Sequence, residues 1–162
     1  MKKLLVLAAC ILGYMADVSA QSNKEDIDII QSVYGKDKKT LVEAYMAVPQ
    51  AKSAAFWKLY DEYEDKRKAL GRKKISVLEQ YADNYDKLDN AKALQLAQAA
   101  INNNMEMDKL HSTYLQKFST VVGGKEAARL FQLENYLNTM IKMELLDHIP
   151  FIGELDKTKM KN

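Results

Sequence analysis

The sequence predicts an all-α fold, either an antiparallel bundle of long helices or an elongated helical hairpin cradle, with about four helices. After residue 20 the chain has only two prolines, Pro49 and Pro150, while the good helix formers Ala, Leu, Lys, Glu and Gln are frequent. No window alternates apolar and polar residues long enough to indicate a strand. Apolar residues instead recur at spacings of three and four, which is typical of helices with one buried face.

The first twenty residues have the features of a secretory signal peptide. A basic start at 1–3 precedes a mostly apolar run over 4–15, and small residues at 18–20 favour cleavage before Gln21. The run is too short to span a membrane, and too few apolar residues precede Cys10 to favour a lipoprotein signal. We therefore expect a signal peptide at 1–20, one helical domain at 21–153 and a flexible basic tail at 154–162. The mature protein would be periplasmic or secreted, without membrane insertion.

Composition argues against several classes of function. Cys10 is the only cysteine, so the mature chain would have no disulfide and no cysteine-based metal or redox site. The predicted signal peptide holds two of the 24 Lys and Arg residues and one of the 22 Asp and Glu residues, which leaves 22 against 21. This balance does not favour nucleic-acid binding. Because no P-loop, nucleophile elbow or zinc-protease motif is present, we predict that the protein is not an enzyme and needs no cofactor.

The first two helical regions are expected on either side of Pro49. The first covers 23–47 and is interrupted at Gly35. The second runs from Ala51 to Leu88, and Gly71 in its middle costs only about 1 kcal/mol among good helix formers. We therefore expect one continuous helix of about 57 Å, which is too long for a compact globule of this size.

The last two helices are expected over 89–122 and 125–148. Asp89 is a suitable N-cap for the third helix, and Gly123 with Gly124 should end it. The charged residues Arg67 and Lys74 interrupt the apolar face of the second helix. The apolar positions expected to face the core are Phe56, Tyr60, Tyr63, Leu70, Leu78, Tyr81, Tyr85 and Leu88 in the second helix, Leu94, Ala97, Ile101, Met107, Leu110, Tyr114, Phe118 and Val121 in the third, and Leu130, Leu133, Leu137, Met140 and Ile141 in the fourth.

Two segments 74 residues apart are alike: VPQAKSAAFWKL at 48–59 and VGGKEAARLFQL at 122–133. Each enters a long helix, and chance similarity between two helix starts is the alternative explanation. The pair resembles the two LTxxQ motifs of Spy/CpxP-like exported proteins. The resemblance is confined to about ten residues in each motif and to the layout of the chain. The consensus residues differ here, with Val48 and Val122 in place of Leu, Pro49 and Gly123 in place of Thr, and Lys52 and Glu126 in place of Gln.

The resemblance implies a protein of long helices, commonly a dimer shaped as a shallow cradle. It implies an ATP-independent periplasmic chaperone or envelope-stress protein that binds unfolded or envelope proteins. The segment 54–74 is the candidate binding region, because it combines aromatic residues with a positive belt around the middle of a helix, which would attract acidic segments. Its candidate partner-binding residues are Trp57, Lys66, Arg67, Arg72, Lys73 and Lys74.

The alternative function is a metal-responsive sensor or binding protein, or a structural partner protein of the cell envelope. Met107 and His111 are four residues apart on one helical face, and a thioether with an imidazole would suit copper or nickel. The competing interpretation is that both side chains simply pack in the core.

Overall fold

The computed structural model describes residues 37–147 of the 162-residue chain. The predicted signal peptide at 1–20, Cys10, the break at Gly35 and the tail at 154–162 lie outside the described residues, as do the ends of the predicted first and fourth helices. Statements about the fold concern 37–147 alone.

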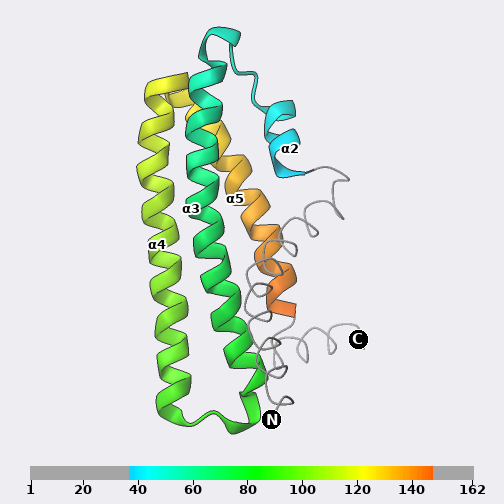
Figure 1. Ribbon diagram of the computed structural model, residues 1–162, viewed down its shortest axis with the longest axis vertical. Helices are drawn as coiled ribbons and strands as arrows, with labels where there is room; N and C mark the ends of the chain where they lie inside the picture. Colours follow the sequence, from blue (N-terminus) through cyan, green and yellow to red (C-terminus); the bar gives the residue numbers. More distant parts are fainter. Residues whose placement is uncertain (1–36, 148–162) are drawn as a thin grey trace, which may run out of the picture.

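The described residues form an elongated, all-helical structure (Figure 1). The α-helices are α2 (Lys38–Tyr45), α3 (Gln50–Asp83), α4 (Asn90–Val122) and α5 (Gly124–Asp147), and the short 3₁₀ helix η1 (Tyr85–Lys87) lies between α3 and α4. Helices α3 and α4 run side by side in opposite directions, α5 turns back at the far end of α4, and α2 lies on the α5 side of the hairpin. No strand occurs between residues 37 and 147, so the all-α prediction is confirmed.

Helix α3 is continuous through Gly71, as the sequence predicted. Its 34 residues give a length of about 51 Å. The helix ends at Asp83 rather than at Leu88, because the chain passes into η1 before it reverses. At this end the Asn84 side chain donates a hydrogen bond to the Gln80 carbonyl at 2.9 Å, which satisfies one of the last carbonyls of the helix.

Both ends of α4 form where the sequence predicted. Asp89 is the N-cap, and its carboxylate accepts a hydrogen bond from the Lys92 backbone N–H at 2.7 Å. At the other end Gly123 has φ of 95° and ψ of 156°, a conformation that only glycine adopts readily. Helix α5 starts at Gly124, one residue before the expected start.

The main core lies where α3, α4 and α5 meet at the α2 end of the hairpin. Phe56 and Phe118 place their ring centroids 5.3 Å apart across α3 and α4. A second, smaller cluster joins α2 to α5. The main cluster consists of Val42, Met46, Phe56, Tyr60, Tyr63, Tyr114, Phe118, Val122, Ala127 and Leu130, and the second of Leu41, Leu137 and Ile141.

The predicted core face was wrong in the first half of α4. Leu94 and Ile101 are 71% and 53% exposed, whereas Leu96 and Asn103 are buried. The first half of α4 carries two apolar stripes. The buried one continues into Tyr114 and Phe118, but it contains the polar residue Asn103, so hydrophobic periodicity did not identify it. Ala97 follows Leu94 to the surface, and Tyr85 is exposed as well because η1 replaces the last turn of the expected helix.

Candidate functional site

The structure separates Trp57 from the basic residues of the candidate binding region. Trp57 is half-buried at the contact between α2 and α3, with its ring centroid 4.9 Å from that of Phe56. The ammonium group of Lys39 on α2 lies 5.3 Å from the centre of the indole ring. Trp57 therefore contributes to the docking of α2, at a distance along α3 from the basic belt.

The belt itself divides into surface and interior residues. Lys73 pairs with Glu106 on α4 at 3.0 Å, and both side chains are about half exposed. Arg72 and Lys74 are half-buried and have partners of their own. Arg67 was a candidate partner-binding residue with the others, but only 4% of it is exposed. Its guanidinium group belongs to the buried charge cluster described below.

A shallow groove runs along the outside of the α3/α4 hairpin. It has a volume of about 390 Å³. Leu70 and Leu110 are half-buried apolar residues that line it. Lys66, Lys109 and Lys117 also line the groove, and each is exposed. The groove thus combines apolar side chains with three lysines, and Glu106 is the one carboxylate among the described residues that line it.

Glu62 forms ion pairs with two of the lysines along the groove and so neutralises part of their charge. Its carboxylate accepts hydrogen bonds from Tyr114 at 2.5 Å, from Lys66 at 3.2 Å and from Lys117 at 3.3 Å. The Tyr114 hydroxyl, followed by the two lysines, lowers the pKa of Glu62 to about 2, so this carboxylate is ionised at neutral pH. Lys66 and Lys117 also lie 5.4 and 4.6 Å from the centre of the Tyr114 ring.

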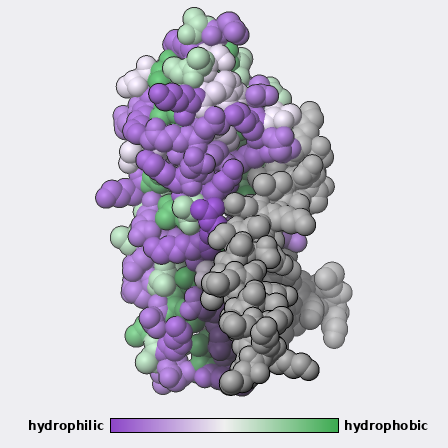
Figure 2. Space-filling model, viewed as in Figure 1, coloured by the Kyte–Doolittle hydropathy of each residue, from purple (hydrophilic) through white to green (hydrophobic). Residues whose placement is uncertain are grey.

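A row of exposed apolar side chains follows the opposite side of α4 from its buried stripe. Leu94, Ile101 and Met105 are 71%, 53% and 64% exposed, and spacings of seven and four residues place them on one side of the helix. We call these three residues the α4 row. In Figure 2 apolar residues appear as separate green patches within a mostly hydrophilic surface.

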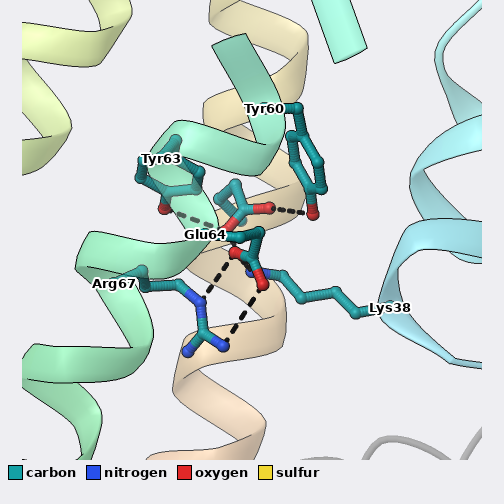
Figure 3. Close-up of polar contacts among 6 residues, drawn as sticks. Lys38, Tyr60, Tyr63, Glu64 and Arg67 are labelled. Carbon is teal, nitrogen blue, oxygen red and sulfur yellow. Dashed lines mark hydrogen bonds and ion pairs between the residues drawn. The ribbon is translucent and has the colours of Figure 1, made fainter. Parts of the chain in front are cut away.

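A buried charge cluster holds α2 against α3 and α5 (Figure 3). The Lys38 ammonium group on α2 donates to Glu64 on α3 and to Glu134 on α5, at 2.6 Å in each case. Arg67, one turn after Glu64, donates to the same carboxylate at 2.8 and 3.4 Å. The cluster pairs two cations with two carboxylates, so it carries no net charge.

Two tyrosines complete the coordination of Glu134, which has no exposed surface. Tyr60 donates to one carboxylate oxygen at 3.1 Å and Tyr63 to the other at 2.9 Å. Burial, followed by the charge of Glu134, raises the pKa of both tyrosines, which therefore stay protonated as donors. Burial alone would raise the pKa of Glu64, but the charges of Lys38 and Arg67 outweigh it and lower that pKa to about 2.

Neither Glu134 nor Lys38 was predicted from the sequence as a functional residue. A signal for Glu134 was present, because Leu130, Glu134, Leu137 and Ile141 follow spacings of four, three and four that place the glutamate within the buried face of α5. Its partner Lys38 is 96 residues away in the sequence. Charges inside a helix stripe indicate a buried pair only when the partner is known, so the cluster as a whole was not predictable.

Met107 and His111 lie on the side of α4 that packs toward the interior, and both are half-buried. The His111 ring lies between aromatic rings, with centroids 6.2 Å from Tyr63 and 5.7 Å from Phe131. Burial lowers the pKa of His111 below its usual range, which favours the neutral imidazole at neutral pH. Within residues 37–147 no three His, Cys, Asp or Glu side chains are grouped so that they could hold a metal ion.

None of the helices in the described part of the chain is long and apolar enough to cross a bilayer. No family model, curated protein or solved structure matches this chain. The resemblance to Spy/CpxP-like proteins therefore stays a prediction from the two motif segments.

Proposed function

We propose that the protein is an exported helical binding protein of the Spy/CpxP-like kind, which holds unfolded or envelope proteins without ATP. The α4 row is the observation that carries this proposal. Three large apolar side chains, Leu94, Ile101 and Met105, are more than half exposed along one side of a long helix. Several large apolar residues exposed along the same side of a helix are a feature of interaction surfaces, whereas single exposed apolar residues need no explanation.

The shape of this surface suits weak binding to many partners. The α4 row offers separate apolar contacts instead of a deep pocket, and the groove beside it adds Leu70 and Leu110 within reach of solvent. An unfolded chain can place apolar side chains on such contacts in many registers. Met105 adds to this adaptability, because methionine is flexible and polarisable.

The lysines of the groove favour partners that combine apolar with acidic residues. Lys66, Lys109 and Lys117 lie around the apolar side chains of the groove, and the carboxylates of Glu106 and of Glu62 beside it offset only part of their charge. An acidic partner segment would be drawn to this face by long-range attraction, which speeds encounter and falls with salt. We therefore expect unfolded acidic proteins to be held better than basic ones.

The α4 row can be tested by replacing Leu94, Ile101 and Met105 with serine together. All three are exposed, so the helical content and melting temperature should change little. If each lost contact contributes about 1 kcal/mol, the three together should weaken binding to an unfolded acidic client about a hundredfold. The measurement is light scattering of an aggregating client with and without the protein, at low and at high salt.

A matched control replaces Tyr136 and Met143 on α5 with serine, because these residues are 54% and 57% exposed. This variant should protect the client as well as the parent protein does. If the α4 row variant also protects the client as well as the parent, or if the two variants lose protection equally, the proposed binding surface is wrong.

A further inference from the structure

We propose that a cavity between α3, α4 and α5 is a binding site for a small organic anion that carries a hydroxyl group. The cavity has a volume of about 200 Å³ and lies on the opposite side of α3 and α4 from the groove. Residues from all three helices line it, among them Asn103 and Met107 of α4 and Asn138 of α5. This site is independent of the proposed client surface.

Two side-chain amides in this lining have polar atoms that the protein leaves unsatisfied. Asn103 is only 1% exposed, and its Oδ1 has no hydrogen-bond partner. The Nδ2 of Asn138 is also buried without a partner. Buried polar atoms are nearly always hydrogen-bonded, so two such atoms at one cavity call for an explanation. A ligand that accepts from one amide and donates to the other would satisfy both.

The position of Asn103 strengthens this reading. It lies in the buried stripe of α4 between Leu96 and Met107, where an apolar side chain would pack against α3 without an unsatisfied atom. Because a buried amide without a partner destabilises the fold, a helix core position is a poor place for asparagine unless it has a role. The cavity next to it supplies the space for such a role.

The charge around the cavity selects the sign of the ligand. Arg67, Lys74 and Lys142 line it, and none of the described lining residues is acidic. Arg67 already binds Glu64, and Lys74 also has a partner, so we assign the direct contact with the anion to Lys142. Because no described lining residue is acidic, the charge of Lys142 is not opposed within the cavity lining.

The volume limits the size of the ligand. A cavity of about 150 Å³ is enough for the six carbon atoms of benzene, so about 200 Å³ is suited to a compound of about eight non-hydrogen atoms, or slightly more where part of it reaches the exposed Lys142. A carboxylate or a phosphate monoester would meet Lys142 and the Asn138 amide, and a hydroxyl group would donate to Asn103 Oδ1. Small hydroxycarboxylates and hydroxyl-bearing phosphate esters share this chemistry.

Calorimetric titration and ligand-induced melting shifts of the purified protein can test the site. Malate and succinate form the decisive pair, because they differ only by the hydroxyl group. We expect malate to bind about tenfold more tightly than succinate, the effect of one hydrogen bond to a buried acceptor. Glycerol 3-phosphate forms a second arm, with glycerol as its uncharged control. Binding of this ester but not of malate assigns the phosphate member of the class.

Three variants connect binding to this cavity. Asn103→Leu should remove the preference for malate over succinate. Lys142→Gln, at an exposed residue, should weaken the binding of both malate and succinate several-fold without unfolding the protein. Lys125→Gln removes the same charge from the first turn of α5, away from the cavity lining, and should leave binding unchanged.

The proposal is overturned if neither malate nor glycerol 3-phosphate binds at millimolar concentration, or if malate binds but no more tightly than succinate. It is also overturned if Lys142→Gln and Lys125→Gln have the same effect. Should Asn103→Leu fail to fold, the comparison of these two lysine variants still decides whether the anion occupies this cavity.

Discussion

Replacing Lys38 with methionine should destabilise the protein by about 3 kcal/mol, the lower end of the cost of breaking a buried ion pair. The Lys38 side chain is 9% exposed, and its ammonium group lies 2.6 Å from the carboxylates of Glu64 and Glu134. Methionine keeps most of the side-chain volume but removes the charge. Glu64 would still have Arg67, so the loss falls mainly on Glu134.

Two features of the structure keep this cost at the lower end of the range. Tyr60 and Tyr63 continue to donate to Glu134 after the lysine is gone. Helix α2 has only eight residues, so it can detach and admit water to the carboxylate. Even so, about 3 kcal/mol is a large part of the 5–15 kcal/mol by which folded domains are stable.

Urea unfolding followed by circular dichroism measures the effect. With a slope of about 2 kcal/mol per molar urea, the midpoint should fall by about 1.5 M. The matched control is Lys39→Met in the next position of α2. Lys39 pairs with Asp61 at 2.7 Å, but both side chains are about half exposed, so this change should cost no more than about 1 kcal/mol.

A double variant separates charge from packing. Lys38→Met combined with Glu134→Gln leaves no unpaired buried charge, and Tyr60 and Tyr63 can still bond to the amide. It should be more stable than Lys38→Met alone, because an ion pair replaced as a unit costs little. If Lys38→Met and Lys39→Met cost the same, or if the second change gives no recovery, the cluster does not hold α2 as we describe.

Two further predictions concern the turn after α4 and the buried histidine. Gly123→Ala should lower the free energy of unfolding by about 1–3 kcal/mol because of the positive φ of 95°. Gly124→Ala, with open space around the new methyl group, should be neutral or slightly stabilising. Equal effects of the two changes in thermal melts would contradict the turn geometry. Because the folded-state pKa of His111 is lowered, its contribution to stability is complete above the unfolded pKa of about 6.5 and is lost as pH falls below it. His111→Phe keeps an aromatic ring between Tyr63 and Phe131. In urea titrations this variant should therefore lose less stability than the parent protein between pH 7.5 and pH 5. An unchanged pH dependence would show that burial does not lower the pKa of His111.

Local signals in the sequence predicted most of the helix boundaries. Asp89 caps α4 through its own carboxylate, and Gly123 ends the same helix, because both effects depend on a residue and its immediate neighbours. The continuity of α3 through Gly71 followed in the same way from the helix propensity of the surrounding residues. Such features need no knowledge of what packs against the helix.

The features that were predicted wrongly or not at all are determined by contacts between helices. Arg67 interrupts an apolar stripe, and only the folded structure shows that it pairs with Glu64 inside the protein. In α4 the choice between the stripe with Leu94 and the one with Leu96 is made by the surface of α3. Long-range pairing is set by the three-dimensional arrangement, so periodicity along one helix could not predict it.

The charge cluster also constrains the order of events during biosynthesis. Lys38 leaves the ribosome long before Glu134, its partner 96 residues later in the chain. Since α2 needs a carboxylate from α3 and another from α5, it has no complete docking site until nearly the whole domain has been made. During that interval the ammonium group remains in water, and the apolar side of α2, with Leu41 and Val42, stays uncovered. Helix α2 therefore cannot complete its docking before α5 is present.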